Sequence, residues 1–124
     1  MNLVLKDKRQ KIGFAFAWNG LKEVISKEYN FRIHLLAAFL VIIAGMIFRL
    51  SAVEWAIILI VVGFVLVMEM VNSIVERIID YVKPEYHIQA KLIKDIAAAC
   101  VLVSAIFAII IGILIFGPKI LLLF

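Results

Sequence analysis

The chain has 124 residues, of which 66% are hydrophobic, with a mean hydropathy of +1.15 and a formal net charge of +4. Ordinary globular proteins are only about half apolar, so this composition excludes a soluble domain and predicts one membrane-embedded domain, residues 1–124. The positive charge forms no basic stripe with interleaved aromatic residues, which argues against nucleic-acid binding. We expect no secretory signal, because the N-terminal residues lack an apolar segment and a cleavage site.

The first predicted element is an amphipathic helix over about residues 8–28 that lies on the membrane surface. Apolar side chains recur there at helical spacing and form one stripe, with polar residues elsewhere around the helix. Glu28 falls on this stripe, so it either follows a bend or faces something other than lipid. The stripe consists of Phe14, Trp18, Leu21 and Ile25.

Three transmembrane helices are predicted next, over about residues 31–50, 53–75 and 93–116. Each contains a run without charged side chains, and a helix of about 20 such residues spans the hydrocarbon core. The first two runs are shorter, but they extend through interfacial residues whose charged ends can reach the headgroups. The predicted fold is therefore an all-α membrane protein.

The distribution of lysine and arginine predicts the orientation of these helices. Seven basic residues precede the first uncharged run, whereas the loop between the first two spans has only Arg49. The segment from Arg77 to Lys94 carries four more. Because basic residues favour the cytoplasmic side, the N-terminus and the second loop are expected in the cytoplasm and the C-terminus outside.

The sequence EMVNSIVERIID, residues 69–80, places four polar side chains along one face at the end of the second span. With Trp55 at the outer interface, Glu69 lies about 21 Å along the helix axis and Glu76 about 31 Å. Glu69 is therefore predicted below the inner interface, where a carboxylate is costly unless it faces a bundle interior. The four side chains belong to Glu69, Asn72, Glu76 and Asp80.

A second polar group opens the third span. Lys91 and Lys94 flank its first turn and Asp95 follows. A helix N-terminus with two lysines attracts phosphate, although the same lysines are also typical of cytoplasmic flanking residues. The small residues after Asp95 allow close helix packing. Cys100 lies further along this apolar run and is expected to be a small packing residue.

These residues together favour a kinase that acts on an alcohol dissolved in the membrane. Carboxylates and an amide oxygen suit Mg²⁺, which typically binds one or two carboxylates plus substrate phosphates. A deeper carboxylate can accept the proton of a lipid hydroxyl, and phosphoryl transfer otherwise requires positioning and charge neutralisation. No P-loop or protein-kinase motif is present.

Two other classes remain open from the residues alone. A small membrane transporter can be built around an intramembrane glutamate, but transporters place such residues near the midplane rather than at one interface. A catalytically silent scaffold would leave the alignment of Glu69, Asn72 and Glu76 unexplained.

Two segments of the sequence resemble the bacterial diacylglycerol kinase/undecaprenol kinase family of small, trimeric, integral-membrane lipid kinases. They are FAWNGLKEVISKEYNFRIHL and EMVNSIVERIIDYVKPEYHIQAKLIKDIAAACVL. The central motif is E-x-x-N-[ST]-x-x-E, followed about twenty residues later by K-D, and the resemblance covers nearly the whole chain. It implies a homotrimer in the bacterial plasma membrane with sites shared between subunits. Three spans cannot surround a polar site, so Glu69 of a single chain is expected to face lipid, and an oligomer would resolve this.

The resemblance also implies roles for individual residues. Glu69 matches the general base that takes the proton of the lipid hydroxyl, and Asn72 matches an amide that supports the site. Glu28 and Glu76 match the carboxylates that hold Mg²⁺ on ATP. Further positions that match nucleotide contacts are Arg9, Phe16, Glu85, Tyr86, His87, Lys94 and Asp95.

For a few further positions, the resemblance implies a role less specifically. Relatives often have tyrosine where this chain has Phe16, so a ring contact with adenine is expected without a hydroxyl hydrogen bond. Trp55, Ala98 and the apolar face of the surface helix resemble lipid-contacting positions. His34 is interpreted as an interfacial histidine.

The lipid substrate is inferred from resemblance alone. The VEWAII sequence at the start of the second span and the KPEYH loop look more like Gram-positive members that phosphorylate undecaprenol. Undecaprenol is therefore the expected substrate, and diacylglycerol is the alternative.

Overall fold

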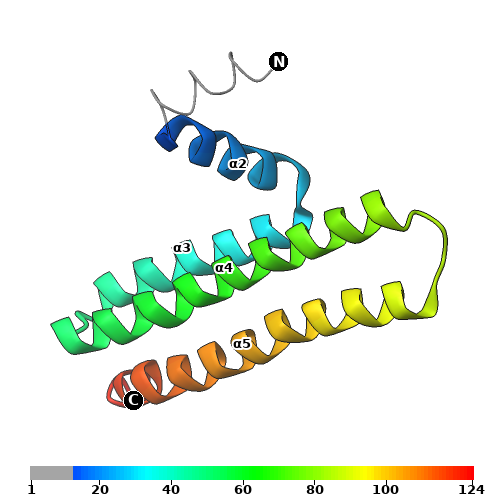
Figure 1. Cartoon of the computed structure of the whole chain (residues 1–124). Helices are drawn as coiled ribbons and strands as arrows, with labels where there is room; N and C mark the ends of the chain where they lie inside the picture. The colour runs from blue at the N-terminus through cyan, green and yellow to red at the C-terminus, as the bar shows by residue number, and fades with distance from the viewer. Residues whose placement is uncertain (1–12) are drawn as a thin grey trace.

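The computed structural model describes residues 13–124, and within that range the chain is entirely helical apart from short connections. The all-α prediction is confirmed there. The helices run along the chain in the order shown in Figure 1. They are α2 (Gly13–Lys27), α3 (Tyr29–Ile47), α4 (Ala52–Val82) and α5 (Ile88–Leu121).

Three of these helices, α3, α4 and α5, are long and apolar enough to cross a membrane. Their bounds differ from the predicted spans, because α4 continues to Val82 and α5 already begins at Ile88. The sequence prediction stopped where charged residues appear, but backbone hydrogen bonding continues beyond the hydrocarbon. With 31 and 34 residues, α4 and α5 are about 46 and 51 Å long, well over the roughly 30 Å of the core.

The connections between helices have local causes. Glu28 has an extended backbone (φ −103°, ψ 105°) and separates α2 from α3, so it lies at a bend, as one of the two sequence alternatives expected. Arg49 has a positive φ of 54° in the turn between α3 and α4, the two helices that form the first hairpin. Ser51 then caps α4 through a capping box with Glu54, which satisfies free N–H groups at the helix start. His87 caps α5, because its Nδ1 accepts from the backbone N–H of Gln89 over 3.1 Å.

The helices pack in sequence: α2 contacts α3, α3 contacts α4, and α4 lies along α5 (Figure 1). Few large apolar side chains are buried, and Ile58 is the most completely enclosed, at 1% exposed. Most large hydrophobic residues instead lie on the outer surface, as in a protein whose solvent is lipid. None of the residues of α2 is buried within the chain.

Candidate active site

Glu69 is buried inside a single chain, at 4% exposed, although the sequence analysis expected it to face lipid. That expectation was wrong because α3 packs over the polar face of α4 and brings His34 against the carboxylate. His34 Nε2 lies 3.6 Å from Glu69 Oε2. Burial of the carboxylate therefore does not depend on a second subunit.

Two neighbours of Glu69 on α4 are also buried, Asn72 at 7% and Ser73 at 2% exposed. Asn72 Nδ2 donates to Glu76 Oε1 over 3.4 Å. Asn72 Oδ1 and Ser73 Oγ have no hydrogen-bond partner in the described part of the chain. Unpaired buried polar atoms cost about 1–3 kcal/mol each, so this face of α4 is suited to an additional polar ligand or water.

Glu28 reaches the same region from the bend between α2 and α3. Arg77 Nη2 on α4 donates to Glu28 Oε1 over 3.1 Å, and Arg77 Nη1 lies 3.5 Å from Glu23 Oε1 on α2. The charges of Glu28 and Glu76 both act on the Glu69 carboxylate. We call Glu28, His34, Glu69, Asn72 and Glu76 the acidic cluster; it joins residues that the sequence separates by up to 48 positions.

Glu23 on α2 is the second, more exposed carboxylate that contacts Arg77. Its carboxylate also pairs with Lys27 Nζ over 2.8 Å on the same helix. The hydrogen bond from Lys27, with a smaller contribution from Arg77, lowers the pKa of Glu23 below its ordinary value. Glu23 is therefore charged at neutral pH, and its attraction to Arg77 weakens only as acid protonates it.

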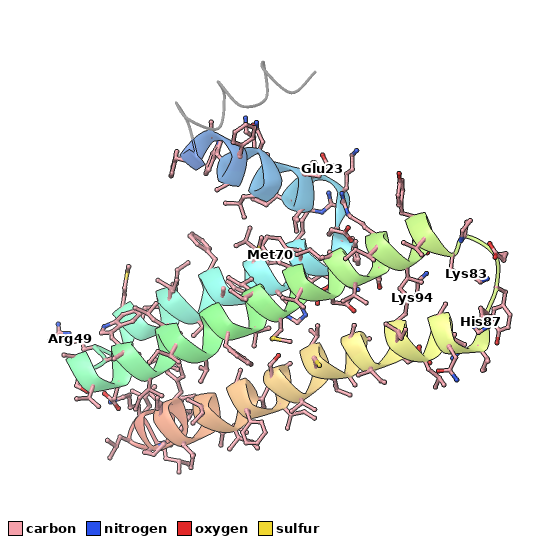
Figure 2. All side chains as sticks on the ribbon, viewed as in Figure 1. Glu23, Arg49, Met70, Lys83, His87 and Lys94 are labelled. Atoms are coloured by element: carbon pink, nitrogen blue, oxygen red, sulfur yellow. The ribbon has the colours of Figure 1, made fainter. Side chains whose placement is uncertain are left out.

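A second site lies at the loop between α4 and α5, a pocket of about 450 Å³ that we call the loop pocket. Figure 2 shows Lys83, His87 and Lys94 gathered at this end of the molecule. Lys94 forms an ion pair with Asp80 across the two helices. The pocket lining includes Asp80, Glu85, Tyr86, His87, Lys91 and Lys94.

The charges in the loop pocket are mostly paired. Lys83 Nζ lies 3.0 Å from Glu85 Oε1. A backbone hydrogen bond and the lysine together lower the pKa of Glu85. Lys91 Nζ pairs with Asp95 Oδ2 over 2.6 Å, one turn further along α5. Asp95 does not line the pocket, so the structure groups four of the five nucleotide positions expected around this loop.

Other expected positions lie elsewhere. Phe16 is on α2, 40% exposed, and lines no part of the loop pocket. Arg9 lies outside the described residues. Trp55 is partly buried against Gly45, where an added Cβ would approach Trp55 Cη2 to 2.6 Å, so its ring packs within the first hairpin. Ala98 is exposed on α5.

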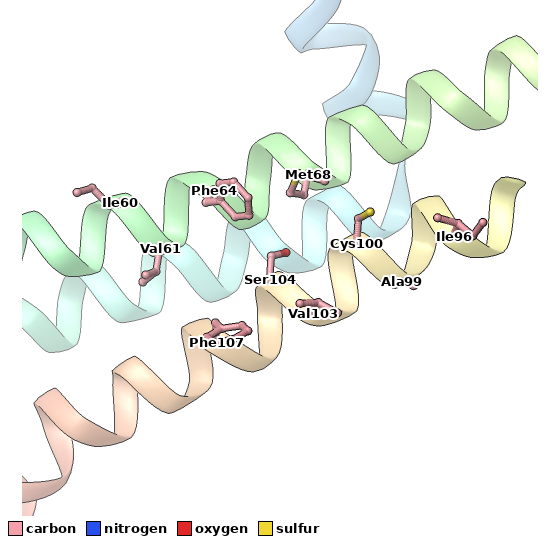
Figure 3. Close-up of a pocket in the computed structure, with 10 residues that line it drawn as sticks. All are labelled: Ile60, Val61, Phe64, Met68, Ile96, Ala99, Cys100, Val103, Ser104 and Phe107. Carbon is pink, nitrogen blue, oxygen red and sulfur yellow. The ribbon is translucent and has the colours of Figure 1, made fainter.

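An apolar groove of about 590 Å³ runs between α4 and α5, with Phe64 and Phe107 along its walls (Figure 3). Cys100, expected to be a small packing residue, lines this groove and is exposed, so it is not packed within the single chain. The groove's lining is almost wholly carbon, which suits an acyl or prenyl chain or another apolar helix.

The acidic cluster offers carboxylate and amide oxygens, which are the ligands that Mg²⁺ prefers. Across residues 13–124, no three His, Cys, Asp or Glu side chains form a ready-made metal cage. Mg²⁺ does not need one, because it typically binds one or two carboxylates and completes its shell with phosphates and water. Glu28 and Glu76 are the carboxylates of the cluster available to such an ion, and the unpaired Oδ1 of Asn72 lies in a buried position beside Glu76. The residues present therefore fit this ion with a phosphate ligand.

Sequence reasoning missed three residues of this region. His34 was interpreted as an interfacial residue, because nothing in the spacing shows that α3 turns it toward Glu69. Ser73 and Arg77 were not singled out, although both lie within the polar segment at the end of α4. Each directly follows a residue of the polar face, Asn72 or Glu76, and this position was the signal in the sequence that could have identified them.

The fold and the two sites define an integral membrane protein whose acidic cluster contains a buried carboxylate. Residues 15–116 match the family model described as prokaryotic diacylglycerol kinase. The chain therefore belongs to this family, and it is a lipid kinase.

Individual relatives agree with this assignment. The chain is 38% identical over 119 residues to the undecaprenol kinase of Bacillus subtilis strain 168, covering 92% of this chain and 97% of that protein. It is 35% identical to a diacylglycerol kinase of Synechocystis over 102 residues, 82% of this chain and 58% of the relative. Identity to the Escherichia coli K12 diacylglycerol kinase is 28% over 95 residues, covering 77% and 78% of the two chains.

Proposed function

We propose that this lipid kinase transfers the γ-phosphoryl group of ATP to undecaprenol and so makes undecaprenyl phosphate. The observation that carries the mechanism is the burial of Glu69 at 4% exposed, next to a cluster of carboxylates that continues toward the helix end. The greater identity to an undecaprenol kinase than to the two diacylglycerol kinases supports this choice of lipid.

Glu69 acts as the general base of this reaction. Its carboxylate takes the proton of the lipid hydroxyl, the lipid oxygen attacks the γ-phosphorus, and the bond to ADP breaks. The lipid reaches Glu69 from within the bilayer, because the carboxylate lies below the charged end of α4. Asn72 holds Glu76 in place through its amide N–H.

Glu28 and Glu76 would hold Mg²⁺ at this site, and the ion would supply neutralisation of phosphate charge during the transfer. Glu28 must then exchange its present partner, Arg77, for the metal. The loop pocket receives the remainder of the nucleotide, with Lys94 as a cation for phosphate once it leaves Asp80. The nucleotide contacts comprise Arg9, Phe16, Glu85, Tyr86, His87, Lys94 and Asp95.

The assembly is a homotrimer in the bacterial plasma membrane, with α2 as an amphipathic helix on the cytoplasmic surface. The apolar outer surface of α3, α4 and α5 supports association with other copies as well as with lipid. The N-terminus and the α4–α5 loop face the cytoplasm, and the C-terminus lies outside. Trp55 and Ala98 contribute lipid contacts in this arrangement.

Diacylglycerol is the second candidate substrate, because the Synechocystis and E. coli relatives are named diacylglycerol kinases. The deciding experiment gives the purified protein in mixed micelles Mg·ATP with undecaprenol, diacylglycerol or no lipid, and measures ADP release and the phosphorylated lipid. Undecaprenol-dependent turnover with the higher kcat/KM supports the proposal. A higher kcat/KM for diacylglycerol selects the alternative, and ADP release without any lipid product contradicts both.

A further inference from the structure

His34 is the ionisable side chain that the structure places against Glu69. It lies on α3, whereas Glu69, Asn72 and Glu76 lie on α4 and Glu28 lies at the bend between α2 and α3. Its Nε2 lies 3.6 Å from Glu69 Oε2. Its side chain is 26% exposed, compared with 5% for that of Glu69, so His34 is the more accessible member of the pair.

The proposed reaction leaves Glu69 with a proton that has to leave before the next cycle. Among the described residues, His34 is the basic side chain that lies within 4 Å of this carboxylate. Asn72 and Ser73 cannot take up a proton near neutral pH. Glu28 and Glu76 also act on Glu69 through their charges, but both are committed to Mg²⁺ in the proposed mechanism.

We propose that His34 takes the proton from Glu69 after each phosphoryl transfer and passes it to water. The Oε2–H bond of protonated Glu69 breaks and an Nε2–H bond forms on His34, whose ring then releases one proton to solvent. The overall reaction of an alcohol with ATP releases that same proton, so no further reactant is needed. This role rests on the proposed base function of Glu69, and because His34 acts through Glu69 it is a relaying and positioning residue.

The geometry suits such a relay. A separation of 3.6 Å is longer than a formed hydrogen bond, but catalytic contacts commonly shorten in the substrate complex or are bridged by one water. Glu69 on α4 is the charged group in contact with His34, whereas Glu76 on α4 and Glu28 at the bend are charged neighbours of Glu69, and Arg77 is held by Glu28.

The test replaces His34 with glutamine, which keeps a polar side chain but cannot relay a proton. We expect kcat to fall about tenfold or more, while KM for Mg·ATP stays within about twofold of the parent value. Free imidazole should restore turnover, and the restored rate should rise with pH in parallel with the unprotonated fraction of imidazole. Leu36→Val, a conservative change at a 60% exposed position of α3, is the control and should leave kcat unchanged.

Several outcomes would overturn the relay. Unchanged kcat in His34→Gln contradicts it directly. A loss that imidazole does not restore assigns His34 a structural role only, and a raised KM for Mg·ATP with normal kcat assigns it to nucleotide binding. If the glutamine variant does not assemble, as judged by size-exclusion chromatography, His34→Asn is measured in the same way with the same expectations.

A double variant separates this inference from the proposed function. In the Glu69→Gln background, His34→Gln should cause no further loss, because the relay has no proton to receive. Additive losses contradict the relay while leaving the lipid kinase mechanism intact. Full activity of Glu69→Gln alone instead contradicts the base assignment, whatever His34 does.

Discussion

Arg77 donates a hydrogen bond to Glu28 over 3.1 Å and thereby joins α4 to the bend between α2 and α3. The two residues are separated by 49 positions in the sequence. The same guanidinium reaches Glu23 on α2, so one arginine connects the N-terminal helix with the helix that carries Glu69. Since Glu28 is proposed as a metal ligand, this contact competes with Mg²⁺ for the same carboxylate.

Replacing Arg77 with glutamine should lower the Mg²⁺ concentration required for half-maximal activity. The expected change is roughly two- to fivefold, the range that exposed ion pairs contribute. Mg²⁺ titration at saturating ATP measures it, and Arg77→Lys, which keeps the charge, serves as the control. A higher Mg²⁺ requirement in Arg77→Gln would show that the arginine supports the metal site.

Glu69→Gln should remove most turnover while leaving folding and ATP binding in place. Loss of a general base costs roughly 10²–10⁴-fold in rate, and the substitution removes no proposed metal ligand. Turnover is measured with the preferred lipid and nucleotide affinity with a fluorescent ATP analogue. An equal loss of nucleotide binding would contradict the division between Glu69 and the metal-binding carboxylates.

Glu76→Gln should instead weaken binding of Mg·ATP. Removing one of two proposed metal carboxylates is expected to raise the apparent KM for Mg·ATP about tenfold, equivalent to about 1.4 kcal/mol. Excess Mg²⁺ should partly restore activity, which would not occur for Glu69→Gln. The role of Glu76 in the metal site is excluded by an unchanged KM.

Gly45→Ala should destabilise the first hairpin of the membrane domain. A Cβ at this position would lie 2.6 Å from Trp55 Cη2 and 3.0 Å from Leu50 Cδ1, so neighbouring side chains must shift at a cost of about 1–3 kcal/mol. Thermal unfolding in detergent measures the loss as a lower Tm.

Gly63→Ala is the matched control, because no atom lies within 4 Å of a Cβ added at Gly63 in α4. It should leave Tm unchanged or raise it slightly, since alanine favours the helix. Equal Tm values for the two variants would mean that the Trp55 ring moves aside freely.

The number and type of the membrane elements followed from the sequence, because hydrocarbon permits only helices or closed barrels and the apolar runs are long. Their ends were less predictable. The bounds of α4 differ from the predicted span because charged residues such as Glu76 and Asp80 end the apolar run without ending the helix. The bend at Glu28 was anticipated as one of two explanations for a carboxylate on an apolar stripe.

The sequence by itself determined that the chain is a helical membrane protein and that Glu69, Asn72 and Glu76 share one helical face, because both features depend on composition and local periodicity. Only the tertiary structure decided that α3 covers this face, burying Glu69 against His34, and that Arg77 holds Glu28. These contacts depend on how separate helices rotate and pack against one another. Spacing within one helix constrains its own faces, but it does not specify which residue of another helix will meet them.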